Sequence, residues 1–306
     1  MPELARTVYY LGVHLLYASL VWLCAWLLTS SRFGSATTKY WIWVATALNF
    51  IVPTGAILDR AWSGHLAWAT PLRAIGAAGV AAAEHRTLAA AAGAVWLAGA
   101  GVMLVRLVLR IRAERRDSRA EAAAPVAAWL PGGVPVRYDG GSQAPAVGGL
   151  LRPHIALPRG IERLLSGPEL DAVLIHELTH ARRRDNLVRL VYEVGLCVFW
   201  FHPLVWVSGS RLALYRELSC DESVIRSNQG GDLISALTKL ADPREDLLLQ
   251  ASAASFLSHR LASLVAPRPA AGRTANALLA VVFGAVLAGG VLETIAHTAC
   301  CFLAKR

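Results

Sequence analysis

The residues best suited to chemistry lie in the segment His176-Glu177-Leu178-Thr179-His180. Residues four positions apart share one face of a helix, so the two imidazoles can bind one metal ion. Glu177 directly follows the first histidine, where its carboxylate can take a proton from a water at the metal. Two histidines and a glutamate in five residues also occur by chance. The interpretation therefore needs a further ligand elsewhere in the chain.

The segment Glu217-Leu218-Ser219-Cys220-Asp221 offers such a ligand. A catalytic zinc ion usually takes three protein ligands and keeps one position for water. Glu217 and Asp221 are four residues apart and share a helix face. We expect Glu217 to bind Zn²⁺ and Asp221 to accept the free N–H of a ligand histidine.

Four other residues near these motifs are weaker ligand candidates. Cys220 and Glu222 point away from the helix face that carries the third ligand. Asp185 is expected to be a surface charge, and His202 a packed or interfacial histidine. The alternative to a metal site is a solvated acidic helix face beside unrelated histidines.

The composition indicates a membrane protein. Of the 306 residues, 55% are hydrophobic and 17% are charged, whereas soluble domains average about 45–50% and about 25%. The formal net charge is +9. The basic residues cluster beside apolar segments, so the positive-inside rule accounts for them and direct nucleic-acid binding is not expected. The five cysteines show no disulfide-like spacing.

Three N-terminal stretches are long enough to cross a bilayer, which needs about 20 apolar residues. They cover about residues 7–29, 40–58 and 88–109. We interpret the first as an uncleaved helix, because it is longer than the apolar core of a signal peptide, about 7–15 residues. Arginines after the third stretch place that end in the cytoplasm and the N-terminus outside. A last stretch, about 277–299, is expected to run from inside to outside.

The fold class that we expect is a mostly α membrane protein: a multi-helix transmembrane bundle with an embedded α+β zinc peptidase domain at the cytoplasmic face. The strand candidates are Val134–Tyr138 and Ala146–Ile155, the latter interrupted by two glycines, and a helix begins near Pro168. The predicted units are three transmembrane helices (1–110), a basic and Ala/Pro-bearing linker (111–132, with 121–131 as its core), the peptidase domain (133–275), and a C-terminal transmembrane helix with a short tail (276–306).

The apolar stretch Leu187–Gly209 is predicted to double back rather than to cross the membrane. A single crossing would place Glu217 on the opposite side from both histidines, where one metal ion cannot join them. Proline at 203 disfavours helix at the residue before it. We therefore predict a membrane-dipping helical hairpin at about 187–216, with the site near the cytoplasmic membrane surface.

The chemistry that fits these residues is zinc-assisted hydrolysis of an amide bond, with Glu177 as base and then proton donor. An exposed strand near Val147 is expected to bind the substrate by edge pairing. The substrate-binding candidates are Val147, Gly148, Gly149, Leu150 and Leu151. Candidates for stabilising an oxyanion, each with packing or an ion pair as the alternative role, are Arg211, Tyr215 and Arg216.

Taken together, the motifs resemble those of the BlaR/MecR-type integral-membrane zinc peptidases, an antirepressor peptidase family. The similar segments are Pro145–Pro158, His176–Leu187, Phe201–Leu204 and Arg216–Glu222, with a weaker match at Ile234–Ala241. The resemblance covers about residues 130–245, and the three preceding helices match in layout only. It implies a gluzincin-like protease with zinc on His176, His180 and Glu217, and with Glu177 as the catalytic residue.

The resemblance also suggests signalling by cleavage of a cytoplasmic protein, such as a winged-helix repressor, or of the protease itself. Such receptors carry a C-terminal extracellular sensor, which we expect this chain to lack. The signal is then expected to arrive through a partner protein, the loop from Asp59 to Arg86, or the membrane lipid. The expected location is a bacterial-type plasma membrane, with the active site on the cytoplasmic side and the C-terminus outside.

Two other functions are compatible with the sequence. One is a membrane quality-control or processing protease with the same zinc chemistry and a broader substrate range. The other is a non-catalytic metal-binding membrane sensor or scaffold. The presence of every catalytic residue type argues against the non-catalytic function.

Overall fold

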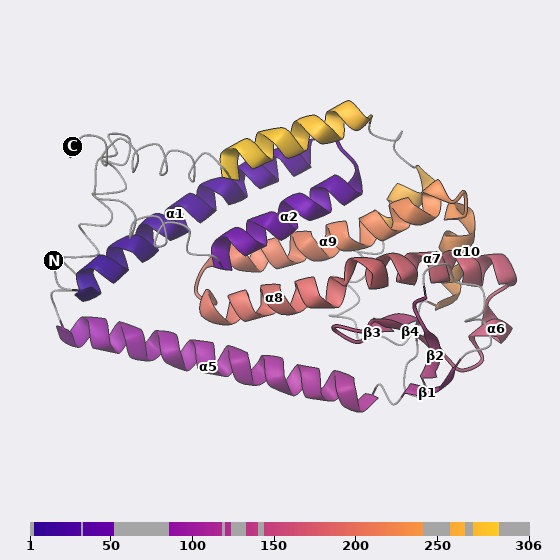
Figure 1. The fold of residues 1–306 in the computed structure, drawn as a ribbon, viewed down its shortest axis with the longest axis horizontal. Helices are drawn as coiled ribbons and strands as arrows, with labels where there is room; N and C mark the ends of the chain where they lie inside the picture. The colour runs from indigo at the N-terminus through magenta and orange to yellow at the C-terminus, as the bar shows by residue number, and fades with distance from the viewer. Residues whose placement is uncertain are drawn as a thin grey trace.

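The protein is mostly helical, with one small sheet (Figure 1). The computed structural model describes residues 3–31, 33–51, 86–117, 120–123, 133–139, 144–240, 258–266 and 272–287. The helices are α1 (Glu3–Ser30), α2 (Ala36–Ile51), α5 (Arg86–Asp117), α6 (Ile161–Leu164), α7 (Gly167–Arg183), α8 (Asp185–Val198), α9 (Pro203–Arg226) and α10 (Gly230–Leu240), followed by helices at 258–265 and Arg273–Leu287. The strands are β1 (Ala120–Ala123), β2 (Val136–Asp139), β3 (Ala146–Gly148) and β4 (His154–Pro158).

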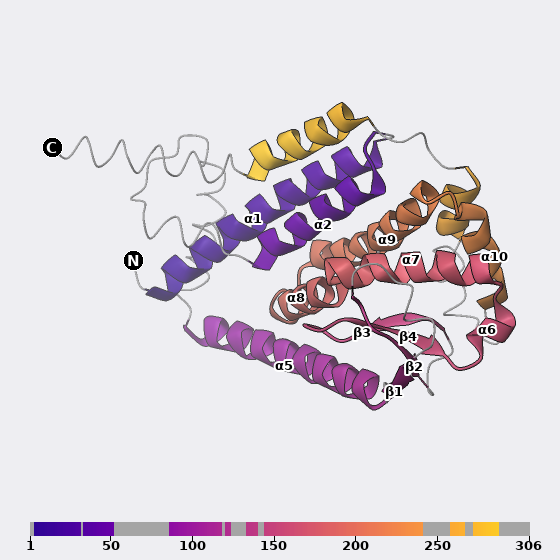
Figure 2. The ribbon, with the colours of Figure 1, turned by 45° about the vertical axis from the view of Figure 1, so that its right-hand side comes forward.

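Helix α2 lies between α1 and α9, and the helix Arg273–Leu287 lies against α1 and α2 on the outer side (Figures 1 and 2). The outer contact is apolar, because Val21 and Ile42 pack against Leu279 and Phe283. The hydroxyl of Tyr17 also donates to the backbone oxygen of Val286 at 3.0 Å. The described helix nearest the C-terminus thus packs on the two N-terminal helices, and α2 in turn packs on α9.

Helices form at the apolar stretches of the N-terminal part, as the sequence predicts. Among the described residues, one helix, Ala90–Ala113, is long and apolar enough to cross a membrane, while His14–Ser30 and Arg273–Leu287 are shorter. The multi-span bundle therefore stays a prediction. The second stretch beyond Ile51, residues 59–85 of the predicted loop, and the last stretch beyond Leu287 lie outside the described residues.

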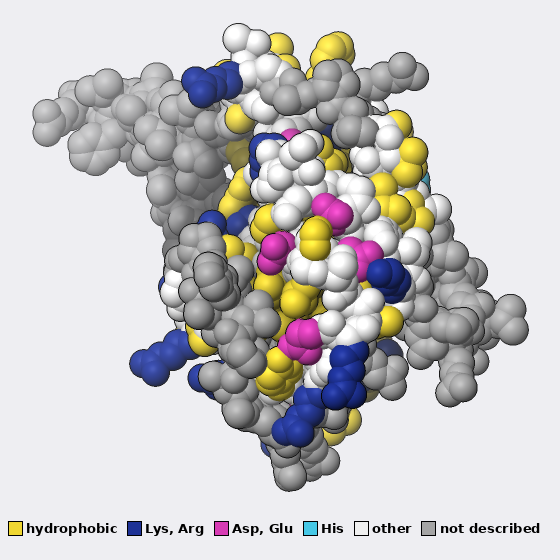
Figure 3. Space-filling model, turned by 90° about the vertical axis from the view of Figure 1, so that its right-hand side faces the viewer, with side chains coloured by type: hydrophobic (Ala, Val, Ile, Leu, Met, Phe, Trp, Pro, Cys, Tyr) yellow, Lys and Arg dark blue, Asp and Glu magenta, His cyan; other side chains and the backbone are white. Residues whose placement is uncertain are grey.

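The surface of α5 differs from that of the far end of the molecule. On α5, Leu97, Val102 and Leu109 are each more than half exposed. At the end formed by α6, α7 and α10, acidic and basic side chains are interspersed with hydrophobic ones (Figure 3). A long apolar exposed helix suits a lipid environment, whereas a mixed charged surface suits water.

The sheet has the strand order β1-β2-β4-β3. β2 and β4 are parallel, and the outer strands β1 and β3 are antiparallel to their neighbours. The linker predicted at 121–131 stays a prediction; at its start, Ala120–Ala123 forms β1 and pairs with β2. Main-chain pairing tolerates the alanines there, although they show no strand pattern. The candidate strand Ala146–Ile155 is divided into β3 and β4 by a turn in which Gly149 has a φ of 81°.

The core of the predicted peptidase region lies between this sheet and α7. Val136, Ile155 and Leu157 are at most 1% exposed and pack against apolar residues of α7, α9 and α10. Helix α7 contacts both β3 and β4 (Figure 2). The sheet and α7 are therefore fixed relative to each other, which places the motif helix beside the edge strand β3.

Helices α8 and α9 form a helical hairpin, with the turn at residues 199–202 (Figure 1). The break before Pro203 confirms the helix boundary that the proline predicts. The hydroxyl of Tyr192 on α8 donates to the backbone oxygen of Val205 at 2.9 Å. Gly209 leaves room for that ring, since a Cβ there would lie 2.2 Å from the tyrosine oxygen. The returning helix carries Glu217 back to α7, whereas a dip of this pair into the membrane stays a prediction.

Candidate metal centre

Helix α7 presents both histidines of the HExxH motif on a largely buried face. The helix begins with a capping box, in which the backbone N–H of Ser166 donates to the Glu169 carboxylate at 2.8 Å. Apolar residues of α7 face the sheet core. His176 is 4% exposed, and the side chain of His180 is 12% exposed. The first motif is therefore held by local helix signals together with core packing.

Ligand atoms of three residues converge from α7 and α9. The two Nε2 atoms of His176 and His180 are 3.2 Å apart. Oε2 of Glu217 lies 3.4 Å from Nε2 of His176, and Oε1 lies 3.7 Å from Nε2 of His180. A tetrahedral zinc ion with bonds of about 2.0–2.1 Å has ligand–ligand distances of about 3.3–3.4 Å. The separations match those of a zinc site within a few tenths of an ångström.

The other ring nitrogen of each histidine faces a carboxylate. Nδ1 of His176 lies 3.0 Å from Oδ1 of Asp221, and Nδ1 of His180 lies 2.7 Å from Oδ2 of Asp185. The His180–Asp185 contact is a hydrogen bond, which places the proton of the neutral His180 ring on Nδ1, and the close contact of His176 with Asp221 favours the same tautomer. Both Nε2 atoms then lie on the side of the Glu217 carboxylate. Lone pairs this close repel each other unless a cation lies between them. The residues present therefore fit a metal ion.

Each of these carboxylates is in turn held by an arginine. Arg260 donates from Nε and Nη2 to the two oxygens of Asp221, at 2.9 and 2.7 Å. Arg183 donates in the same way to Asp185, at 3.1 and 2.6 Å. Such two-bond pairs fix both the position and the orientation of a carboxylate. The site thus contains two parallel chains of contacts, each running from an arginine through a carboxylate to a histidine.

The position of Asp185 corrects the sequence-based expectation. Asp185 was expected to be a surface charge, but it is 3% exposed. In a continuous helix, a residue five positions after His180 would point about 140° away from it. Arg184 breaks the helix with a left-handed conformation (φ 56°, ψ 47°). This break lets the Asp185 carboxylate reach back to the imidazole.

The site favours positive charge at the point where the ligand atoms meet. Burial alone would raise the pKa of Glu217, but hydrogen bonds with His176 and His180 hold it well below the usual range. Burial alone would lower the pKa of His180, but hydrogen bonds with Asp185 and Glu217, among others, raise it well above the usual range. Burial alone would likewise lower the pKa of His176, but its contacts with Asp221 and Glu217 raise it. The charge of the half-buried Glu177 adds to this rise in pKa. A proton or a metal ion meets this preference.

Cys220 also lies near the histidines, but on a different side. Its Sγ is 3.5 Å from Nδ1 of His180, the nitrogen that already faces Asp185. Ligand atoms of His176, His180 and Cys220 lie within 4.8 Å of one another. A metal among them would require His180 to bind through Nδ1 and to give up its carboxylate. The Nε2 atoms and Glu217 require no such change, so the geometry favours Glu217 as the third ligand.

The remaining ligand candidates have structural contacts. Oε2 of Glu222 accepts hydrogen bonds from the backbone N–H and the hydroxyl of Thr37, at 3.1 and 3.0 Å, and so caps α2. His202 packs against Phe50, with ring centroids 5.2 Å apart, as expected for a packed histidine. Neither contact leaves these side chains near the histidine pair.

The candidates for stabilising an oxyanion are also engaged. The buried hydroxyl of Tyr215 donates to the backbone oxygen of Thr29 at 3.0 Å. Arg216 donates to Oε1 of Glu217, at 3.1 and 3.0 Å. The structure gives Tyr215 a packing role and Arg216 an ion pair with a candidate ligand. Arg211 is half-buried on the same helix.

The predicted substrate-binding residues lie at the edge of the sheet. β3 contains Val147 and Gly148, and the turn that follows it contains Gly149, Leu150 and Leu151. Asn186, next to Asp185, donates from its amide nitrogen to the backbone oxygens of Val147 and Gly149, at 2.8 and 3.2 Å. This side chain ties the edge strand to the start of α8. It also occupies two of the backbone acceptors on that edge.

Sequence reasoning missed several residues of this site. The sequence patterns assigned no role at the metal to Arg260, Arg183 or Tyr40. Arg260 lies 39 residues after its partner Asp221, and no local pattern links the two. Arg183 is two residues before Asp185, and this spacing becomes informative only when the helix break at Arg184 is known.

Comparison with known proteins gives a consistent result. Residues 10–262 match the family described as BlaR1 peptidase M56. The Regulatory protein BlaR1 of Bacillus licheniformis is 30% identical over 159 residues, which is 48% of this chain and 26% of that protein. The Methicillin resistance mecR1 protein of Staphylococcus aureus is 27% identical over 93 residues, 30% of this chain and 16% of that protein. The aligned part thus spans about a quarter or less of these relatives.

Proposed function

The chain belongs to the BlaR1 peptidase M56 family, and on this premise we propose that it is a membrane-embedded zinc endopeptidase with a regulatory role. The proposed ligands are His176, His180 and Glu217. The observation that carries the proposal is the meeting of lone-pair atoms from three residues at 3.2–3.7 Å, with both histidines backed by carboxylates. A solvated acidic helix face would not be buried, and it would not be matched so closely to tetrahedral zinc.

The chemistry divides between the metal and the chain. When bound, zinc would polarise the scissile carbonyl and lower the pKa of a water at its open position. Glu177 would serve as the base that takes a proton from the attacking water and as the acid that gives it to the leaving amine. Asp221 and Asp185 keep the rings of His176 and His180 oriented and their Nδ1 protons in place.

The substrate is proposed to bind along β3 as an added strand. The backbone N–H of Ile155 on β4 donates to Pro135, on the side of β2. The paired residue on β3, Val147, therefore directs its peptide groups to the outer edge. Asn186 already occupies the Val147 oxygen, which leaves the Val147 N–H as the anchor for a substrate carbonyl.

The proposed location follows from the distribution of apolar and basic residues. Helix α5 would cross the membrane and end with Arg106, Arg110 and Arg112 on the cytoplasmic side. The peptidase region follows directly, so its active site would face the cytoplasm. Together with relatives named for regulation and for methicillin resistance, this placement supports a cytoplasmic repressor, or the chain itself, as the substrate. A partner protein or the membrane would supply the signal.

The test compares wild type with Glu177→Gln, which keeps the size of the side chain and removes the base. The variant is expected to retain zinc after purification in detergent and to lose proteolysis by about 10²–10⁴-fold. Proteomics of the cytoplasm should show fragments of one DNA-binding protein, or of the chain itself, in wild type only. Unchanged cleavage by the variant would refute the mechanism. Many unrelated membrane-protein fragments would point to quality control instead.

A further inference from the structure

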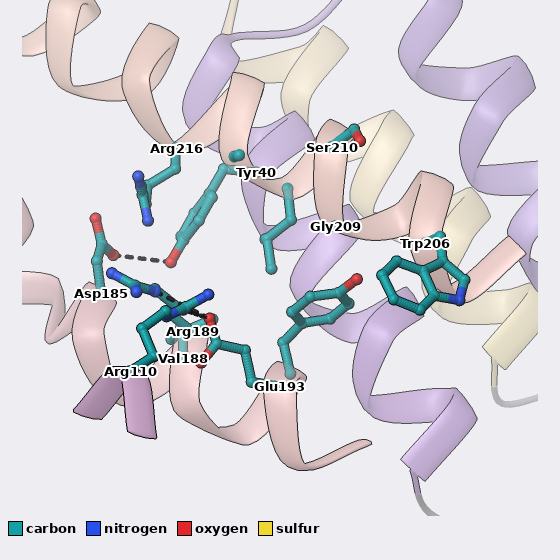
Figure 4. A pocket seen from close by; sticks show the side chains of 13 residues that line it. Tyr40, Arg110, Asp185, Val188, Arg189, Glu193, Trp206, Gly209, Ser210 and Arg216 are labelled. Carbon is teal, nitrogen blue, oxygen red and sulfur yellow. Dashed lines mark hydrogen bonds and ion pairs between the residues drawn. The ribbon is translucent and has the colours of Figure 1, made fainter. Parts of the chain in front are cut away.

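A tyrosine from helix α2 contacts a carboxylate of the candidate metal centre. Tyr40 is fully buried, and its hydroxyl donates to Oδ1 of Asp185 at 2.8 Å (Figure 4). The other oxygen of Asp185 faces Nδ1 of His180 at 2.7 Å. One carboxylate therefore bridges the α2 hydroxyl and a proposed ligand. A buried donor or acceptor left without its partner costs about 1–3 kcal/mol, so the two ends hold each other in place.

Arg183 joins the same group. Its guanidinium lies over the ring of Tyr40, 4.3 Å from the centroid, while donating two hydrogen bonds to Asp185. The Tyr40 ring thus holds the Arg183 guanidinium, while the Tyr40 hydroxyl holds the Asp185 carboxylate. Tyr40 contributes through both its polar and its aromatic part.

Helix α2 has a second polar attachment one turn earlier. The backbone N–H and the hydroxyl of Thr37 donate to Glu222, and Glu222 directly follows Asp221, the partner of His176. Tyr40 also packs against Tyr215 of α9 in one apolar cluster, so α2 and α9 are joined by apolar as well as polar contacts. The start of α2 is therefore bound to both segments that orient the proposed ligands.

A cavity of about 380 Å³ lies beside the Tyr40–Asp185 pair, between α5, α8 and α9 (Figure 4). It is lined by charged side chains, among them Arg189, Glu193 and Arg216. Water in such a space can replace part of a lost hydrogen bond. The pair is therefore not enclosed by close packing on this side, so a shift of α2 can change the contact.

We propose that α2 is part of the metal centre, with Tyr40 as a positioning residue that sets metal affinity through Asp185 and His180. This inference rests on the proposed zinc site. A hydrogen bond weakens steeply as its geometry departs from linearity. Rotation or translation of α2 therefore changes how firmly His180 is oriented. The helix provides a physical route from the membrane-facing part of the chain to the peptidase site.

The test is a matched pair of substitutions, Tyr40→Phe and Tyr215→Phe, in the full chain purified in detergent. Both tyrosines are buried in one cluster of α2 and α9, and their hydroxyls donate to different groups: that of Tyr40 to Asp185, and that of Tyr215 to the backbone oxygen of Thr29. Only that of Tyr40 reaches a partner of a proposed ligand. Zinc affinity is measured by competition with a chromophoric chelator. Partners of ligand histidines contribute about 10–100-fold to metal affinity. Because water from the cavity can take over part of the lost hydrogen bond to Asp185, Tyr40→Phe should weaken zinc binding by about tenfold. Tyr215→Phe should bind zinc within about twofold of wild type.

A double-mutant cycle separates this role from general destabilisation. If Tyr40 acts through Asp185, Tyr40→Phe has no further effect on zinc affinity in an Asp185→Asn background. Equal zinc binding by wild type and Tyr40→Phe, or equal losses in both tyrosine variants, overturns the inference. Circular dichroism identifies a variant that fails to fold. In that case Glu222→Gln, which weakens the attachment to Thr37, takes its place. Unchanged zinc affinity in Glu222→Gln would then contradict the inference. The readout is zinc, so a chain that binds zinc without proteolysis refutes only the proposed function.

Discussion

The identity of the third metal ligand gives the sharpest test of the site. His176 and His180 can pair with either Glu217 or Cys220. The Glu217 oxygens lie 3.4 and 3.7 Å from the two Nε2 atoms, whereas the Cys220 sulfur lies 3.5 Å from the Nδ1 atom of His180. Two conservative substitutions, Glu217→Gln and Cys220→Ser, remove one candidate each and keep the size of the side chain.

The expected loss can be worked out from the number of ligands. Structural zinc sites with four protein ligands are worth about 10–16 kcal/mol, so one ligand accounts for about 2.5–4 kcal/mol. At 1.4 kcal/mol for each tenfold change, Glu217→Gln should weaken zinc binding by about 10²–10³-fold. Cys220 is fully buried beside Arg183, so Cys220→Ser should change packing a little and zinc affinity by less than about threefold.

The assay is zinc competition with a chelator of known affinity, combined with metal analysis of the purified protein. Both variants must first show the helix content of the wild type, so that a loss of zinc reports on the ligand. A Cys220→Ser protein that loses zinc while Glu217→Gln retains it would refute the assignment. It would also show that His180 binds through Nδ1 and has released Asp185.

Three further substitutions test other parts of the structure. Arg260→Gln leaves Asp221 buried without its cation and should cost about 3–5 kcal/mol of stability; a loss below about 1 kcal/mol in denaturant titration contradicts this. Hydrogen bonds from Lys239, Ser235 and Ser166 lower the pKa of Glu169 to about 2, so its stabilisation is complete above about pH 4.5 and is lost as the pH falls toward 2. The melting temperatures of wild type and Glu169→Gln should therefore converge with acid, and a constant difference is the contrary result. Gly149→Ala places a Cβ 2.4 Å from the Arg152 backbone oxygen at a φ of 81°, which should lower proteolysis without affecting zinc; full activity would exclude a role for this turn.

The chemistry and the local elements of this protein follow from the sequence itself. The His-Glu pair lies on a predicted helix, and the break before Pro203 follows from backbone sterics. The demand that one metal joins His176 and Glu217 predicts that the chain between them returns to the same side. These are statements about neighbours along the chain, for which residue type and spacing are sufficient.

The surroundings of the site were decided by the tertiary structure. Asp185 reaches His180 only because Arg184 adopts a left-handed conformation, which residue spacing on an ideal helix excludes. The sheet likewise includes Ala120–Ala123, at the start of the predicted linker, by main-chain pairing.

Tyr40 and Arg260 come from segments 145 and 39 residues away from their partner carboxylates. Their contacts depend on how α2 and the helix at 258–265 pack against α8 and α9. The sequence by itself therefore determines which atoms can bind and activate a metal, because that depends on residue type and local periodicity. Only the fold decides what orients those atoms, because burial and charge pairing depend on segments that the chain order does not bring together.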